Sequence, residues 1–273
     1  MIAKVIDSPR FSAVVKGRYG YIVFNKNDIY IGKAIEKYGE YSESEVSLFR
    51  QVCKEGDIVV DVGANIGTHT LALSGLVGEK GRVYAYEPQR IVFQTLCANM
   101  AINSIENVEC YQMAVSSEDG FVLIPNIRYD IENNFGGLSL QKIKTGYKVP
   151  SICLDNFLDI PKLKLLKIDV EGMEHKVING SINLIEKHKP VLYVENDVQE
   201  KSKGLIELIW SLNYRAYWHL PPLFNPDNFA GDTENIYPGI LSVNMLCLHN
   251  SENKTLERFS EIIDSDYHPI GKK

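Results

Sequence analysis

Short apolar runs alternate with longer amphipathic segments along the chain from Gly56 onward. The apolar runs are nearly continuous, which is typical of strands buried on both faces, and the amphipathic segments repeat their apolar positions with helical spacing. Strands are predicted at 57–62, 82–87, 108–115, 163–170, 190–196, 214–220 and 241–249. Helices are predicted between them at 67–77, 89–103, 173–188 and 203–213. This order predicts an α/β, Rossmann-like fold with a doubly wound, mostly parallel, seven-stranded sheet.

Two long connections interrupt this alternation, at 116–150 and 220–240. Both follow the carboxyl ends of predicted strands, where open α/β sheets bind their ligands, so both are predicted to contact substrate. The glycines of "NNFGG" at 133–137 would permit a lid movement. The prolines of 220–240 exclude a regular helix, and the strand that follows can pair either parallel or antiparallel.

The N-terminal part has a different pattern. Alternating runs at 11–15 and 19–25, with a further β-rich run at 29–31, predict a hairpin. Residues 42–53 show helical spacing behind Ser42 or Ser44 as a cap. We expect three parts: an N-terminal appendage of hairpin and helix over 1–55, one α/β domain over 56–250, and a C-terminal tail over 251–273.

Composition and charge narrow the possible partners. The 273 residues are 45% hydrophobic and 23% charged, as in ordinary globular proteins. The net charge is −6, and the lysines within 162–167 alternate with leucines and are interpreted as a strand's polar face, so nucleic acid is not expected as a partner. The five cysteines lack metal-binding spacing and are interpreted as reduced thiols. Without a signal-like N-terminus or a long apolar run, we expect a cytoplasmic protein with no integral membrane segment.

The segment "DVGANIGTHT", residues 61–70, joins a predicted strand to a predicted helix. Gly63 and Gly67 permit close approach of the backbone to a ligand. A dinucleotide fingerprint requires glycine where this chain has Asn65 and Thr68, which argues against a bound pyrophosphate and therefore against NAD. The amide of Asn65 suits an amino-acid-bearing nucleoside such as S-adenosylmethionine.

Glu87 ends the next predicted strand, in "YAYEP". A carboxylate at this position can accept hydrogen bonds from both ribose hydroxyls of a nucleoside. Alternatively, it complements the dipole of the helix that follows. Its combination with the glycine loop favours the cofactor role.

Five segments carry a resemblance to a known family. They are "DVGANIGTHTLALS", "GRVYAYEP", "NVECYQMAVSSEDG", "LKIDVEGMEHKVINGS" and "VLYVEND", in that order and spacing. With them, residues 20–248 resemble the FkbM-type family of S-adenosylmethionine-dependent methyltransferases. The resemblance implies transfer of a methyl group to an oxygen, often on a sugar or a polyketide.

The resemblance also implies roles for particular residues. Within the glycine loop, Gly63, Asn65 and Gly67 would line the methionine side of the cofactor. His69 is considered from its position alone: in the first turn after the loop it can touch the cofactor or, alternatively, be a solvated helix residue. Glu87 would hold the ribose, and Ala114 with Val115 would flank the adenine or, alternatively, simply belong to the apolar core. The cofactor-binding residues expected are Asp61, Gly63, Asn65, Gly67, His69, Glu87, Ala114 and Val115.

Carboxyl groups end two neighbouring predicted strands, Asp169 on one and Glu195 with Asp197 on the next. A hydroxyl must lose a proton as it attacks the methyl group, so a base or a metal is required. Asp169 can serve as the general base. Alternatively, Asp169, Glu195 and Asp197 hold a hard cation such as Mg²⁺. Glu171 and Glu174 lie just beyond and can simply cap the following helix.

The leading hypothesis is an O-methyltransferase dependent on S-adenosylmethionine that acts on a hydroxyl of a sugar, glycan or glycolipid. Asp169 and His219, the latter at the start of 220–240, are the predicted catalytic residues. The alternatives are an NAD(P)-dependent oxidoreductase on a similar sheet and a non-catalytic cofactor-binding relative. The expected partner is a small molecule or glycan, and the identity of the acceptor, the metal and the oligomeric state stay open.

Overall fold

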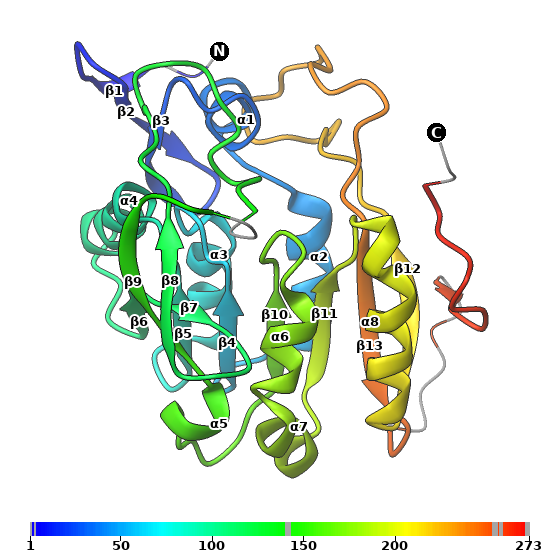
Figure 1. Ribbon diagram of the computed structural model, residues 1–273. Helices are drawn as coiled ribbons and strands as arrows, with labels where there is room; N and C mark the ends of the chain where they lie inside the picture. The colour runs from blue at the N-terminus through cyan, green and yellow to red at the C-terminus, as the bar shows by residue number, and fades with distance from the viewer. Residues whose placement is uncertain (1, 3, 140–142, 253–255, 257–258, 271–273) are drawn as a thin grey trace.

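A single mixed sheet forms the centre of the molecule (Figure 1). The computed structural model describes residues 2, 4–139, 143–252, 256 and 259–270. The sheet has the order β14-β12-β13-β11-β10-β4-β5-β6. Its strands are β4 (Ile58–Val62), β5 (Arg82–Tyr86), β6 (Val108–Tyr111), β10 (Leu165–Ile168), β11 (Val191–Glu195), β12 (Tyr214–His219), β13 (Asn244–His249) and β14 (Ser260–Glu261).

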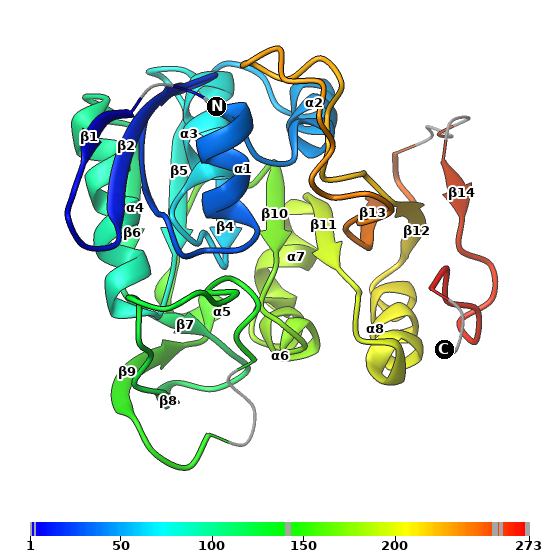
Figure 2. The same ribbon diagram turned by 90° about the horizontal axis from the view of Figure 1, so that it is seen from above.

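Helices cover both faces of this sheet, and Figure 2 shows them as two separate layers. One layer contains α2 (Glu43–Val52), α3 (Thr68–Val77) and α4 (Arg90–Ile102). The other contains α5 (Leu154–Phe157), α6 (Glu174–Asn179), α7 (Ile182–His188) and α8 (Gln199–Ser211). Along β4, Val59 packs with α2 and α3, whereas Val60 and Val62 pack in the cluster that contains α6, α7 and α8. Continuous apolar strands therefore result from burial on both faces, as predicted.

The seven predicted strands are confirmed as the main part of the sheet, and the α/β, Rossmann-like class with them. β4, β5, β6, β10 and β11 are parallel, whereas β13 runs antiparallel to both β11 and β12. The open choice for the last predicted strand is thus decided in favour of antiparallel pairing. The expected tail contributes an eighth strand, because β14 pairs with β12.

The N-terminal hairpin is confirmed as β2 (Ser12–Gly17) and β3 (Gly20–Asn25), with β1 (Lys4–Asp7) added at its edge. The β-rich interpretation of 29–31 is wrong, since α1 (Ile31–Tyr38) begins there and ends at Gly39 in the left-handed conformation (φ 70°). Glycine is favoured at such a helix end because it lacks a Cβ. The predicted helix over 42–53 is confirmed as α2, with Ser42 as its N-cap residue.

A small sheet replaces part of the long irregular segment expected at 116–150. Strands β7 (Ala114–Val115), β8 (Gly120–Ile124) and β9 (Tyr147–Ile152) form it in the order β7-β9-β8. The predicted strand 108–115 is therefore divided between two sheets. The loop interpretation holds only for the stretch between β8 and β9, within which residues 140–142 lie outside the described residues.

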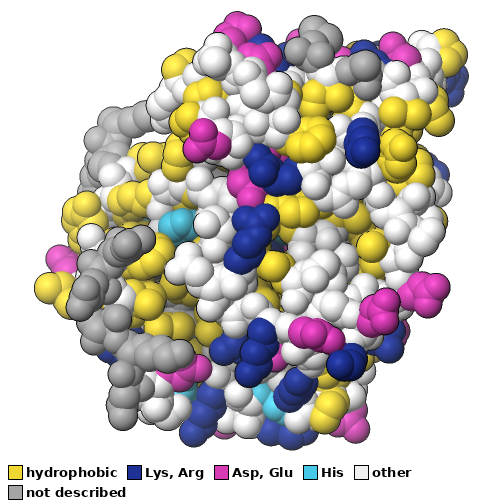
Figure 3. Space-filling view, turned by 180° about the vertical axis from the view of Figure 1, so that it is seen from behind, with side chains coloured by type: hydrophobic (Ala, Val, Ile, Leu, Met, Phe, Trp, Pro, Cys, Tyr) yellow, Lys and Arg dark blue, Asp and Glu magenta, His cyan; other side chains and the backbone are white. Residues whose placement is uncertain are grey.

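Figure 3 views the face on which α2 and α3 lie. Lys and Arg side chains appear there in separate groups, interspersed with acidic and apolar side chains. Within the described ranges, no helix is both long and apolar enough to cross a bilayer.

Candidate active site

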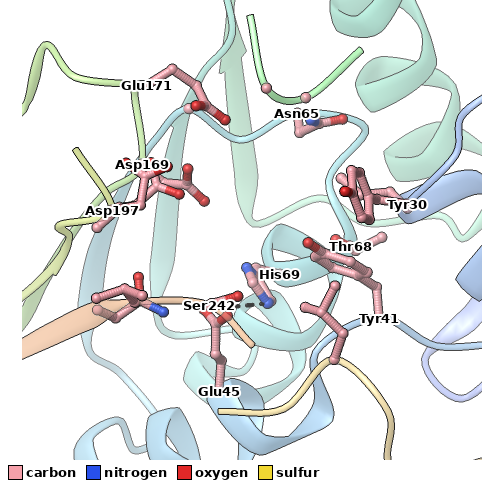
Figure 4. Close-up of a pocket in the computed structure, with 18 of the residues that line it drawn as sticks. Tyr30, Tyr41, Glu45, Asn65, Thr68, His69, Asp169, Glu171, Asp197 and Ser242 are labelled. Carbon is pink, nitrogen blue, oxygen red and sulfur yellow. Dashed lines mark ion pairs between the residues drawn. The ribbon is translucent and has the colours of Figure 1, made fainter. Parts of the chain in front are cut away.

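A cavity of about 420 Å³ opens at the carboxyl ends of β4, β5, β10 and β11. Its volume lies in the range of small-molecule sites. In Figure 4, Asp169, Glu171 and Asp197 lie on one side and Tyr30, Tyr41 and Thr68 on the other. The lining residues described below are Tyr41, Glu45, Gly63, Asn65, His69, Glu87, Lys167, Asp169, Glu171, Glu195, Asp197 and Asn244.

The glycine loop borders the cavity. Glycine is required at positions 63 and 67 because neighbouring protein atoms leave no room for a Cβ there. Gly63 adopts φ 79°, and a Cβ there would lie 1.7 Å from the carbonyl oxygen of Asp169. Gly67 adopts φ 86°, and a Cβ there would lie 2.5 Å from Leu96 of α4. Gly63 lines the cavity, whereas Gly67 does not. Asn65 tolerates positive φ (52°), as expected for asparagine, and also lines the cavity.

Glu87 is 4% exposed and faces the cavity from the end of β5. The backbone N–H groups of Asn65 and Gln89 donate to its two carboxyl oxygens at 3.1 and 2.8 Å. Burial raises the pKa of Glu87 to about 7, although these two hydrogen bonds oppose the change. A carboxylate offers about four acceptor positions, so Glu87 keeps acceptor capacity for a ligand.

Lys167 joins Asp61 to Asp169 beneath the cavity. In the parallel pairing of β10 with β4, Lys167 lies opposite Asp61. Its Nζ lies 3.2 Å from Asp61 Oδ1 and 3.3 Å from Asp169 Oδ2. Burial lowers the pKa of Lys167, but attraction to Asp61 and Asp169 outweighs it, so the pKa is raised. The interpretation of this lysine as part of a strand's polar face is wrong: it is 2% exposed and lines the cavity.

Asp61 is fully buried and does not line the cavity. Its Oδ2 accepts a hydrogen bond of 2.8 Å from Thr70 Oγ1 in α3. Together with the Lys167 ion pair, this bond fixes the start of α3 against β4 and β10. Asp61 thus supports the glycine loop from below.

Acidic side chains gather at the ends of β10 and β11. One carboxyl oxygen from each of Asp169, Glu171 and Glu195 lies within 4.8 Å of the others. Burial, followed by the charges of Asp169 and Asp197, raises the pKa of Glu171 to about 8. The same effects of burial and neighbouring acids raise the pKa of Glu195 and of Asp197. Glu174, the first residue of α6, accepts the Gly172 N–H at 2.8 Å through its Oε1, whereas the N-cap residue Met173 makes no side-chain capping bond.

The N-terminal part contributes an acid that the sequence patterns did not single out. Glu45 of α2 is 4% exposed, and its Oε1 accepts a hydrogen bond of 2.7 Å from Ser42 Oγ. Its Oε2 lies 3.9 Å from Nε2 of His69, the contact dashed in Figure 4. His69 is 6% exposed and lines the cavity, as expected for a residue of the first turn of α3. The spacing of Ser42 and Glu45, which is typical of a capping box, was the one sequence pattern that could have drawn attention to Glu45.

Besides Asp61 and Gly67, three more predicted site residues do not line the cavity. His219 does not line it, because its Nδ1 is hydrogen bonded to Tyr193 Oη at 2.8 Å and its ring packs on Phe259. Burial lowers the pKa of His219. Ala114 and Val115 pair with β9 and are buried, Val115 within the main core cluster. A direct contact of these three with a ligand in the cavity is therefore not supported by their positions.

Both long connections reach the cavity. From 133–137, Asn134, Gly136 and Gly137 line it, and from 220–240, Leu223 and Ile240 do. The remaining aromatic and amide side chains of 220–240 mostly hold that connection in place. Phe224 packs on Tyr38 at 5.4 Å between ring centroids, and Asn225 donates to Glu40 at 2.8 Å.

The chemistry of the lining residues fits S-adenosylmethionine. Glu87 offers acceptors for ribose hydroxyls, and the surrounding acids suit a ligand with a sulfonium and an ammonium group. Buried polar atoms without a hydrogen bond also face the cavity, including His69 Nε2. This nitrogen makes only the 3.9 Å contact with Glu45, so it is available to hydrogen bond a ligand.

The acids that could together bind a divalent cation differ from the set expected from the sequence, which was Asp169, Glu195 and Asp197. The compact group consists of Asp169, Glu171 and Glu195, whereas Asp197 is not part of it. Oxygen ligands suit Mg²⁺. However, Lys167 Nζ already lies 3.3 Å from Asp169 Oδ2 and would repel a second cation there.

Two curated methyltransferases are similar in sequence to part of this chain. The hexuronic acid methyltransferase AglP of Haloferax volcanii is 27% identical over 156 residues, which cover 52% of this chain and 56% of that protein. Methyltransferase 1 of Beauveria bassiana is 26% identical over 147 residues, covering 46% and 59%. The chain thus matches less than two thirds of the length of these curated relatives.

Solved structures that resemble this chain have lower sequence identity to it. The crystal structure of a methyltransferase FkbM from Methylobacillus flagellatus KT has a TM-score of 0.45 and 17% identity, covering 75% of this chain and 50% of that chain. Aeropyrum pernix fibrillarin, in complex with S-adenosyl-L-methionine, has a TM-score of 0.46 and 14% identity, covering 91% and 100%.

The family itself is shown by a sequence model. The model described as the methyltransferase FkbM domain matches residues 61–216, more than half of the chain. The matched range contains the glycine loop, Glu87, Lys167 and the acids at the ends of β10 and β11. It decides against the NAD(P)-dependent oxidoreductase that the sheet alone left open. The chain belongs to the methyltransferase FkbM domain family.

Proposed function

We propose that this protein transfers a methyl group from S-adenosylmethionine to a hydroxyl group of a carbohydrate. The observation that carries the proposal is the convergence of the glycine loop, Glu87 and Asp169 on one cavity. These residues come from the ends of three neighbouring strands, β4, β5 and β10. All of them lie inside the range that matches the methyltransferase domain.

The carbohydrate part of the proposal rests on two supports. The first is the AglP relative, whose name describes a hexuronic acid methyltransferase. The second is the lining of the cavity, which combines acidic and amide side chains with Tyr30 and Tyr41. Polar groups of this kind can hydrogen bond to the hydroxyls of a sugar.

The cofactor supplies an electrophilic methyl group when bound. The chain's own residues bind, orient and accept a proton. Glu87 accepts hydrogen bonds from ribose hydroxyls, while Asp169 Oδ accepts the proton of the attacking hydroxyl. Lys167 acts on Asp169 rather than on the substrate, because its Nζ contacts Asp169 Oδ2 and holds that carboxyl in place.

The test is transfer of a labelled methyl group to a panel of sugars and glycolipids. We expect Asp169→Asn to lower kcat by about 100-fold or more, while S-adenosylhomocysteine binds as to wild type. Asp159→Asn, which changes an exposed aspartate outside the cavity, serves as the matched control. Wild-type turnover by Asp169→Asn would remove Asp169 from the mechanism.

A chelator distinguishes the two roles proposed for Asp169 and its neighbouring acids, which are proton acceptance and metal binding. With Asp169 as general base, turnover is unchanged by EDTA. Turnover that disappears with EDTA and returns with Mg²⁺ assigns the acids to a metal instead. If no acceptor of the panel is methylated while S-adenosylhomocysteine binds, the non-catalytic alternative replaces the proposal.

A further inference from the structure

Two polar side chains, those of Glu195 and Asn244, meet at the cavity. Glu195 ends β11 and Asn244 begins β13, and the two residues lie directly opposite each other in the antiparallel pairing. Both line the cavity. Neither Glu195 Oε2 nor Asn244 Nδ2 has a hydrogen-bond partner at normal distance and angle, and Asn244, which is only 4% exposed, makes just a weaker contact with the Tyr193 hydroxyl. A buried polar atom left without a partner costs about 1–3 kcal/mol, so a ligand group is expected to complete these bonds.

The unpaired atoms differ in kind, which restricts the ligand. Asn244 Nδ2 is a donor and requires an acceptor, whereas Glu195 offers a carboxyl oxygen. A metal ion or an ammonium group would serve only the carboxyl oxygen and leave the amide unpaired. A hydroxyl group both donates and accepts, so adjacent hydroxyls of one sugar ring serve both residues in either protonation state of Glu195.

The electrostatic environment restricts the ligand further. Asp169 and Glu171 each place a carboxyl oxygen within 4.8 Å of one from Glu195. These neighbouring acids oppose any additional negative charge at this place, whether on a side chain or on a ligand. Lys167, the cation among the described lining residues, is already paired with Asp61 and Asp169. A carboxylate on the acceptor would therefore meet repulsion that no unpaired cation among the described lining residues offsets.

We infer that Glu195 and Asn244 form the acceptor subsite, that they bind neighbouring hydroxyls of an uncharged sugar, and that the acids around them reject a hexuronate. The inference rests on the proposed function and deepens it. It separates this chain from its AglP relative, whose name describes a hexuronic acid substrate. Of the two residues that would select the sugar, Asn244 lies outside the range matched by the family model, which ends at residue 216.

The test compares matched glycosides by calorimetry. The probes are methyl hexopyranosides of gluco, galacto and manno configuration and the three corresponding methyl hexuronides, each titrated with and without S-adenosylhomocysteine. We expect at least one hexopyranoside to bind about tenfold or more tightly than its uronide. Glu195→Gln and Asn244→Ala should each weaken that binding by about tenfold, the loss expected for one hydrogen bond to a buried group.

Controls keep the result independent of folding. Glu186→Gln, an exposed acid of α7, should leave the affinity unchanged. Both subsite variants should retain wild-type affinity for S-adenosylhomocysteine, which a misfolded protein would lose. Glu195→Gln should also narrow the difference between the hexopyranoside and its uronide, an effect that mere loss of packing would not produce.

Uronides that bind as tightly as the hexopyranosides overturn the inference, as does wild-type affinity in both variants. Binding that requires Mg²⁺ overturns direct recognition in favour of a metal. If S-adenosylhomocysteine binds and no glycoside does, the subsite is wrong and the cofactor half of the proposed function stands. If S-adenosylhomocysteine itself fails to bind, the proposed function fails, and the titrations without it still decide the preference.

Discussion

At the scale of single residues, Lys167 shows how the register between strands decides what a side chain does. In "KLKLLK" the three lysines look alike, and their alternation with leucines gives no reason to separate them. Only the pairing of β10 with β4 places Lys167 beside Asp61, on the face that α2 and α3 cover. Lys162 lies before β10 and is 54% exposed at its side chain. A buried lysine between two acids is thus a property of the sheet, which the local pattern did not reveal.

Lys167→Met should destabilise the protein by about 3 kcal/mol or more, because it leaves buried Asp61 without its cation. Urea unfolding at pH 7 measures the change. Lys162→Met, on the same segment, should stay within about 0.5 kcal/mol of wild type.

The double variant Asp61→Asn/Lys167→Met should recover part of the loss, since it also removes the uncompensated charge. Equal stability of Lys167→Met and Lys162→Met would show that the ion pairs of Lys167 contribute nothing to the fold.

At the scale of elements, the patterns predicted what depends on local periodicity and missed what depends on distant contacts. The strands of the main sheet could be predicted because each one is a short apolar run in the sequence. The predicted helix 173–188 is instead two helices, because the chain turns at Gly180, where a Cβ would lie 2.0 Å from the carbonyl oxygen of Ser116. β7 was missed because Ala114 and Val115 continue an apolar run and change sheets without a turn signal. His219 was misplaced because the loop's course could not be derived from its composition.

Gly63→Ala should destabilise the protein by more than about 3 kcal/mol, because it combines a left-handed backbone with a clash against β10's end. Gly75→Ala is the matched control: Gly75 lies inside α3 with open space around its Cβ position. Alanine there should stabilise the protein by about 0.5–1 kcal/mol. Thermal and urea unfolding measure both, and a Gly63→Ala protein as stable as wild type would contradict the close approach of the two strand ends.

At the scale of the whole molecule, the cavity joins parts of the chain that the sequence patterns separated. Tyr30, Tyr41 and Glu45 come from the expected appendage over 1–55, and Leu223 and Asn244 come from beyond the range that matches the family model. The matched range supplies the proposed cofactor side, while the flanking parts complete the walls. The division into 1–55, 56–250 and 251–273 remains a prediction about folding units. All three parts contribute to the cavity, because Ile270 of the tail also lines it.

The most direct test of this account is calorimetric titration of S-adenosylhomocysteine into wild type, Glu87→Gln and the exposed control Glu106→Gln. We expect wild type and Glu106→Gln to bind one equivalent equally well and Glu87→Gln to bind about tenfold more weakly or worse, since it loses hydrogen bonds to a charged group. The pKa of Glu87 is raised to about 7, and ribose hydroxyls favour its ionised form, so wild-type affinity should rise from pH 6 to pH 8. In Glu87→Gln that rise should be smaller, and what remains of it belongs to Glu171, whose pKa is raised to about 8 in the same cavity. Equal affinity of all three proteins, with the same pH dependence, would contradict the placement of the cofactor in this cavity.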